Sequence, residues 1–152
     1  MRKILATAAT LGLATLGAIV PATGAQAATP CENAYNALAS GRFAAYNATN
    51  CGTLLGSTEG QDQDWGNSTG VFSGRDTNQA TSLINKGTSG MRVQLFNGTG
   101  DDWAGGNTCL AAGEKISNLD NQYFSTGIEV NNQISSHRWI WSGCGAGLTP
   151  DS

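Results

Sequence analysis

A short run of amide and hydroxyl side chains occurs twice in this 152-residue chain, as Asn-Gln-Ala-Thr-Ser over 78–82 and as Asn-Gln-Ile-Ser-Ser over 132–136. Side chains of these types cap turns by hydrogen bonding to nearby backbone groups. Their oxygens are also the ligands that a hard cation prefers. Because each copy follows strand-like residues and a Gly-rich turn, the repeat predicts two versions of one β unit that share a core.

The sequence offers little from which to build a catalytic site. His137 is the only histidine, so a His-Glu-x-x-His zinc site is excluded, and no nucleophile elbow is present. Asp62 and Asp64 beside Trp65 resemble the acid pair of a glycosidase, although their Gln-, Asp- and Gly-rich surroundings favour solvated turn charges. We therefore expect no enzyme, and we expect His137 to lie at the surface or rim.

Residues 1–27 are typical of a secretory signal peptide. Two basic residues precede an uncharged apolar run over 4–20, and Ala25-Gln26-Ala27 fits the cleavage pattern. The competing interpretation is an uncleaved anchor, because the run approaches the ~20 residues of a spanning helix. Its Ala, Gly and Thr content and Pro21 favour cleavage after Ala27. We expect a secreted, extracellular protein with one domain over 28–152.

The charge of this mature chain narrows its partners. Removal of the leader takes away two of the eight basic residues, which leaves six against eleven acidic residues and a net charge of −5. Nucleic acids are bound through clustered Lys and Arg, and anionic membranes attract basic segments. We therefore expect binding to neither. We also expect a monomer.

All four cysteines lie in the mature chain, at Cys31, Cys51, Cys109 and Cys144. They lack Cys-x-x-Cys metal spacing, and an even number in an oxidising compartment predicts two disulfides. Of the three possible pairings we favour Cys31–Cys51 and Cys109–Cys144, because each bridge then stays within one half.

Short alternating runs broken by Gly, Asn and Asp predict an all-β fold. Residues 42–46 and 91–96 form the first strand of each half, and a turn follows each, with Asn97-Gly98 suited to the positive φ of a hairpin. The repeated phrases then lead into apolar strands at 83–84 and 139–141. We expect one helical turn over 32–39 and a link between the halves over 86–90.

The four tryptophans are candidates for a sugar-binding aromatic face. Trp139 and Trp141 share one side of a predicted strand, and we expect at least one of them to pack in the core. Trp65 and Trp103 are the other two.

The second half resembles a βγ-crystallin Greek key through Phe96, Trp103, Gly105 and the run Asn-Asn-Gln-Ile-Ser-Ser over 131–136. The first half departs from this pattern, because Thr77 replaces the first acid or amide of the run and Cys51-Gly52 stands near the second aromatic position. The resemblance implies a βγ-crystallin-like sandwich of two Greek keys, at about 41–86 and about 91–142.

In that family the six-residue run is a calcium signature. The resemblance implies Asn131, Asn132 and Ser135 as ligands, with Asn78 and Thr81 from the weaker first copy, and a turn of the other half, at 101–102 or 47–50, could complete each site. Few of these groups are charged, so the affinity would be weak, on the order of 10⁻⁴–10⁻³ M. The alternative is that the same side chains only cap turns.

A narrower resemblance is to secreted actinobacterial proteins of the metalloproteinase-inhibitor family, carried by residues 107–114, 51–52 and 134–139. It implies a peptidase inhibitor that blocks an extracellular protease, most simply a metalloprotease, with a rigid loop. Cys109-Leu110 is the first candidate loop, Leu54-Leu55 the second and residues 121–124 the third, and each could instead be a hairpin with core-facing apolar residues. A calcium-binding structural or cell-surface module and a small secreted toxin are the alternative functions.

Overall fold

The computed structural model describes residues 27–100, 103–144 and 147–151. The predicted leader lies outside the described residues except for Ala27, and so do Asp101 and Asp102. Within the described part of the chain, no helix has both the length and the apolar character that a membrane crossing needs.

The secondary structure is mainly short strands, as the alternating runs predicted. Helix α1 begins at Pro30, where the Thr29 side chain accepts a hydrogen bond from the Glu32 N–H and so caps the first turn. The elements in chain order are α1 (Pro30–Ala37), β1 (Phe43–Tyr46), the 3₁₀ turn η1 (Thr49–Cys51), β2 (Leu54–Thr58), β3 (Ser82–Asn85), β4 (Arg92–Phe96), β5 (Asn107–Leu110), β6 (Lys115–Ile116) and β7 (Ser136–Ile140).

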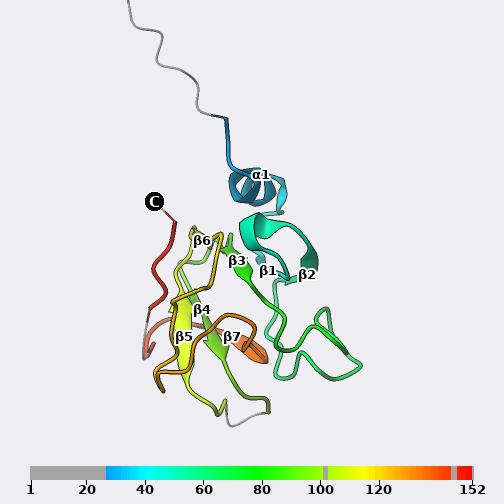
Figure 1. The fold of residues 1–152 in the computed structure, drawn as a ribbon, viewed down its shortest axis with the longest axis vertical. Coiled ribbons are helices and arrows are strands. Elements are labelled where there is room, and N and C mark those ends of the chain that lie inside the picture. The colour runs from blue at the N-terminus through cyan, green and yellow to red at the C-terminus, as the bar shows by residue number, and fades with distance from the viewer. Residues whose placement is uncertain (1–26, 101–102, 145–146, 152) are drawn as a thin grey trace, which may run out of the picture.

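Two antiparallel sheets, ordered β2-β1-β3-β6 and β5-β4-β7, form the body of the molecule (Figure 1). Backbone hydrogen bonds also join one half of the chain to the other. Strand β6 of the second half pairs with β3 of the first, and Asp62 of the first half forms a bridge with His137 in β7. Each sheet is therefore completed by the other half, so the two halves share one core.

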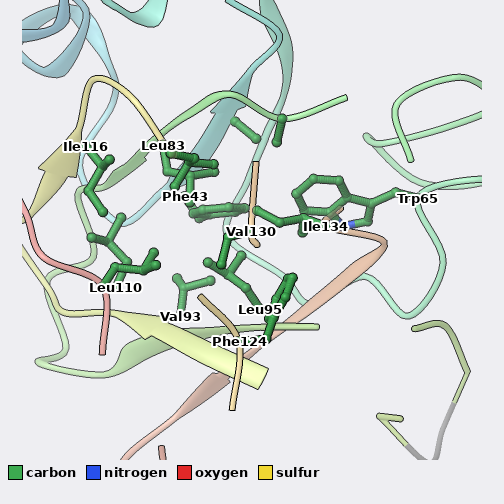
Figure 2. Close-up of a cluster of buried hydrophobic side chains, with 14 of the residues drawn as sticks. Phe43, Trp65, Leu83, Val93, Leu95, Leu110, Ile116, Phe124, Val130 and Ile134 are labelled. Carbon is green, nitrogen blue, oxygen red and sulfur yellow. The ribbon is translucent and has the colours of Figure 1, made fainter. Parts of the chain in front are cut away.

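Side chains from both sheets meet in that core (Figure 2). Phe43 and Leu83 come from the first sheet, and Val93 and Leu95 come from the second. The long loop between β2 and β3 adds Trp65 and Phe72, whose rings stack with centroids 4.2 Å apart. A segment without regular strands thus supplies two of the large buried side chains.

Two disulfides fix the edges of this body. They join Cys31 to Cys51 and Cys109 to Cys144, which is the within-half pairing favoured by the sequence. The first bridge ties α1 to η1, where Ala44, Tyr46 and Ile84 form a second buried cluster with the two cysteines. The Lys86 ammonium also holds α1 against the body, because it donates hydrogen bonds to the Tyr35 and Leu38 carbonyls at the end of the helix.

The loop after β4 folds back tightly on itself. A Cβ atom at Gly98 would lie 2.5 Å from the Ala104 carbonyl oxygen, and one at Gly105, where φ is +86°, would lie 2.5 Å from the Asn97 carbonyl oxygen. Only glycine fits this approach. A turn therefore follows β4 as predicted and closes against Gly105, but neither Asn97 nor Gly98 has the positive φ expected of a hairpin turn.

Candidate functional site

The two amide-and-hydroxyl runs lie against each other where the halves meet. The Asn78 N–H donates to the Ile134 carbonyl at 2.8 Å, and the Asn132 N–H donates to the Ala80 carbonyl at 2.9 Å. Asn78 and Asn132 both adopt left-handed backbone, with φ of 56° and 55°, a conformation that asparagine tolerates better than most residues. The sequence repeat is thus also a structural repeat.

The last hydroxyl of each run has a structural task. Ser82 and Ser136 are both fully buried. The Ser82 hydroxyl donates to the Ala48 carbonyl, and the Ser136 hydroxyl donates to the Gly98 carbonyl. Each serine therefore ties the turn that follows the first strand of its own half to the start of β3 or β7.

The preceding hydroxyl instead faces the amide of the other half. Thr81 Oγ1 donates to Asn132 Oδ1 at 3.2 Å, and Ser135 Oγ donates to Asn78 Oδ1 at 2.9 Å. The structure therefore divides the five predicted ligands between two cross-half pairs. Thr81 and Asn132, with Asn131 next in the chain, form one pair, and Asn78 with Ser135 forms the other.

The Thr81–Asn132 pair has a carboxylate close by. Asp120 Oδ1 accepts from Asn131 Nδ2 at 2.6 Å, and Asp120 Oδ2 accepts from Asn118 Nδ2 at 3.0 Å. Among the described side chains, Asn131 Oδ1 is buried without a hydrogen-bond partner, which is an unfavourable state for a polar atom. Asn118 and Asp120 were not predicted as site residues, although an Asn-x-Asp run is a common oxygen-rich turn.

The Asn78–Ser135 pair has different neighbours. The backbone N–H of Trp65 donates to the Ser135 carbonyl, and the backbone N–H of Leu119 donates to the Thr81 carbonyl. Trp65 and Leu119 are therefore equivalent positions, and the residue that follows is Gly66 at this pair and Asp120 at the other. Thr77 stands where the second half has Asn131, and Asp64 Oδ1 accepts from the Gly66 N–H at 2.8 Å. This pair therefore offers fewer side-chain oxygens of the amide type.

No strongly anionic metal centre accompanies these pairs. Within the described ranges, no group of three or more His, Cys, Asp or Glu side chains is placed to hold a metal ion. A cation at either pair would depend mainly on neutral amide and hydroxyl oxygens. Such a donor set suits a hard cation and is unsuitable for zinc, which takes Cys, His and carboxylate ligands.

The first predicted inhibitory loop is not available to a protease. Leu110 is 0% exposed and packs in the main core, and Cys109 is also buried. The prediction for Cys109-Leu110 is therefore wrong, because both residues belong to the buried strand β5 rather than to a loop. In the second candidate, Leu54 is 54% exposed at the start of β2, whereas Leu55 packs against the core. In the third, Tyr123 is exposed and Phe124 is buried.

His137 is fully buried, so its predicted place at the surface or rim is wrong. The Trp65 indole N–H donates to His137 Nδ1 at 2.9 Å, and His137 Nε2 lies 3.1 Å from the Gly60 carbonyl oxygen. Because Nδ1 accepts, the proton of the neutral ring is on Nε2 and is donated to Gly60. Burial lowers the pKa of His137 from 6.5 to about 4, so the ring is neutral at physiological pH.

Asp62 and Asp64 both accept hydrogen bonds from backbone amides of their own loop. The Asp62 carboxylate accepts hydrogen bonds from the backbone amides of Asp64 and Phe72, and burial raises its pKa. Asp64 in turn accepts from the Gly66 amide. Both side chains therefore brace the loop that carries Trp65 and Phe72 into the core.

The four tryptophans do not share one surface. Trp65 is in the core, and Trp103 lies near Phe96 and the Arg138 guanidinium, with centroid distances of 5.1 Å and 5.2 Å. Trp139 packs partly on the core, as expected for at least one member of its pair. Trp141 is 70% exposed.

Comparison with known proteins supports the fold. No family profile matches the chain, and no curated protein is significantly similar to it. A solved structure described as "Evolution of the eye lens beta-gamma-crystallin domain fold" is similar with a TM-score of 0.50 and 16% sequence identity, over 70% of this chain and 91% of that chain. The chain therefore has a βγ-crystallin-type fold with two disulfides.

Proposed function

We propose that this protein is a secreted, non-catalytic binding module of two Greek keys that holds calcium where its halves meet. The observation that carries the proposal is the unpartnered Asn131 Oδ1 next to the Thr81–Asn132 pair and Asp120. A buried oxygen without a donor is costly to keep, and a bound cation would satisfy it.

The residues present fit calcium in type. Ca²⁺ takes six to eight oxygens from carboxylates, amides, hydroxyls and carbonyls. Thr81, Asn131 and Asn132, with Asp120, would hold one ion, and Asn78 with Ser135 would hold a weaker one. Because few of these oxygens carry charge, we expect affinities on the order of 10⁻⁴–10⁻³ M. The bound ion would join the two halves and so stabilise the folded state.

Millimolar calcium is therefore expected to raise the melting temperature. Millimolar calcium is about one to ten times these dissociation constants, and a ligand that binds only the folded state then adds about 0.4–1.4 kcal/mol, which corresponds to a few degrees for a domain of this size. Thermal melts with calcium, with magnesium and with chelator test this expectation. An unchanged midpoint at millimolar calcium would remove the proposal.

A matched pair of variants locates the stronger site. Asn132→Gly and Asn78→Gly each remove an amide from a position where φ is positive, so neither strains the backbone. We expect Asn132→Gly to lose most of the calcium-dependent shift and Asn78→Gly to keep most of it. Equal behaviour of the two variants would contradict the unequal sites.

Protease inhibition is the second candidate, and Leu54 favours it. This exposed side chain begins β2, an edge strand of its sheet, three residues after the disulfide-bonded Cys51. An edge strand can pair with the backbone of a partner, and the disulfide limits the entropy lost on binding. No feature of the described residues favours the toxin alternative.

Under this second candidate, Leu54→Ala is expected to weaken inhibition about tenfold or more while leaving the melting temperature unchanged, because the side chain is mostly in solvent. Inhibition assays against thermolysin-like and subtilisin-like proteases provide the measurement. Tyr123→Ala, which removes an exposed aromatic from the third candidate loop, is the comparison variant and is expected to inhibit as the wild type does if Leu54 makes the contact. If micromolar wild-type protein slows neither class of protease, the inhibitor hypothesis is wrong.

A further inference from the structure

Trp141 is a large aromatic side chain left 70% exposed directly after β7. Tryptophan is highly buried on average, and an exposed indole commonly marks a binding surface. Trp139, two residues earlier, lies within β7 and packs partly on the core. Arg92 pairs with Ile140, so Met91 lies at the same end of the neighbouring strand β4. One indole therefore lies in β7 and the other just past its end, beside the start of β4.

Hollows open beside both rings. One of about 470 Å³ is lined by Trp139 together with Gly41, Glu59, Thr88, Ser89 and Met91. The other, of about 290 Å³, is lined by Trp141 together with Arg92, Ser142 and Gly143. The larger volume is within the range of small-ligand sites. Hydroxyl and carboxylate groups thus surround the hollow at Trp139, and a guanidinium group lines the hollow at Trp141.

Backbone contacts hold the first indole in place. The Trp139 indole N–H donates to the Gly60 carbonyl at 3.1 Å, and a Cβ atom at Gly87 would lie 2.9 Å from Trp139 Cζ3. The link between the halves therefore runs against the edge of this ring. At Gly90, where φ is +83°, a Cβ would lie 3.9 Å from Trp141 Cζ3. A ring already fixed by its surroundings loses little entropy on binding a ligand.

We propose that this surface binds a linear, neutral oligosaccharide. The apolar C–H faces of two successive sugar rings pack on Trp139 and Trp141, while sugar hydroxyls bond to Glu59, Thr88 and Ser89. A purely apolar ligand would bury the polar groups of the larger hollow without forming hydrogen bonds to them, which is unfavourable. One carboxylate, Glu59, and one guanidinium, Arg92, face these hollows, so neither charge sign favours an ionic ligand.

Titration with cellotetraose, chitotetraose and maltotetraose, followed by tryptophan fluorescence and calorimetry, tests this proposal. We expect saturable binding of at least one of them, in chelator as well as in calcium, which separates this surface from the proposed calcium sites. Trp141→Phe keeps a flat ring and is expected to retain binding. Trp141→Leu and Trp141→Ala are expected to bind about tenfold more weakly.

Tyr123→Ala removes an exposed aromatic on another loop and is expected to bind as the wild type does. The proposal is overturned if none of the three sugars binds at millimolar concentration. Wild-type affinity in Trp141→Leu would also overturn it, because that result would indicate apolar contact without ring stacking. Since Trp141 is mostly in solvent, melting temperatures of the variants should match the wild type, and the comparison of Phe with Leu remains decisive if Ala alone is unstable.

Discussion

Replacing Leu110 with alanine is expected to lower the free energy of unfolding by about 3 kcal/mol. The Leu110 side chain is 0% exposed and lies among core residues of both sheets (Figure 2), so its removal loses apolar burial and leaves a cavity. Leu54→Ala is the matched control, because the same atoms are removed from a side chain that is 54% exposed. The control is expected to change the free energy by less than about 0.5 kcal/mol.

Urea unfolding of the disulfide-intact protein provides both values. A Leu110→Ala variant as stable as the wild type would mean that Leu110 is not packed as described, and it would reopen Cys109-Leu110 as an inhibitory loop. The expected loss of stability would instead leave Leu54 as the leading apolar residue for contact with a protease.

Acidification is expected to destabilise the protein through His137. Its pKa is lowered from 6.5 to about 4 in the folded state. Between these two pH values the unfolded chain binds a proton at His137 and the folded chain does not. Stability is therefore fully present above the unfolded pKa and is lost as the pH falls toward the folded pKa. The loss is about 2 kcal/mol at pH 5 and about 3 kcal/mol below pH 4. Protonation would also remove the hydrogen bond that Nδ1 accepts from Trp65.

His137→Gln is the control for this pH dependence. A glutamine amide offers an acceptor toward the Trp65 indole N–H and a donor toward the Gly60 carbonyl, but it does not titrate. The difference in unfolding free energy between the wild type and this variant, measured from pH 7 to pH 4, isolates His137. Asp62, whose pKa burial raises, is present in both proteins, so its contribution cancels. Parallel pH profiles would contradict the buried neutral histidine.

Several features were predictable because they depend on residues close together in the chain. Alternation and turn residues predicted strands near β1 and β4. The chain turns after β4 as predicted, because Gly98 and Gly105 have no Cβ to clash, although the positive φ lies at Gly105 rather than at Asn97-Gly98. The within-half disulfides followed from the repeat. The repeat itself predicted two similar units, and the matching hydrogen bonds of Asn78 and Asn132 show that similarity in the structure.

Other features depend on which segments meet in space. Alternation along β7 places His137 and Trp139 on one face and Ser136 and Arg138 on the other, but neither set is clearly more apolar, so the sequence did not indicate which face points inward. Pairing with β4 and the bridge to Asp62 place His137 opposite Leu95, in the core. Leu110 was assigned to a loop because it is a large apolar residue directly after a disulfide-bonded cysteine, and its pairing with Val93 in β4 places it in the core instead.

The sequence alone determined the β character, the duplication, the pairing of cysteines and the set of amide and hydroxyl oxygens. The tertiary structure alone decided that Thr81 meets Asn132 and Ser135 meets Asn78, that Asn131 Oδ1 lacks a donor, and that Trp141 remains in solvent while Trp139 packs on the core. The physical reason is that periodicity specifies neighbours along one strand, whereas contacts between the halves are set by how two sheets pack on a shared core.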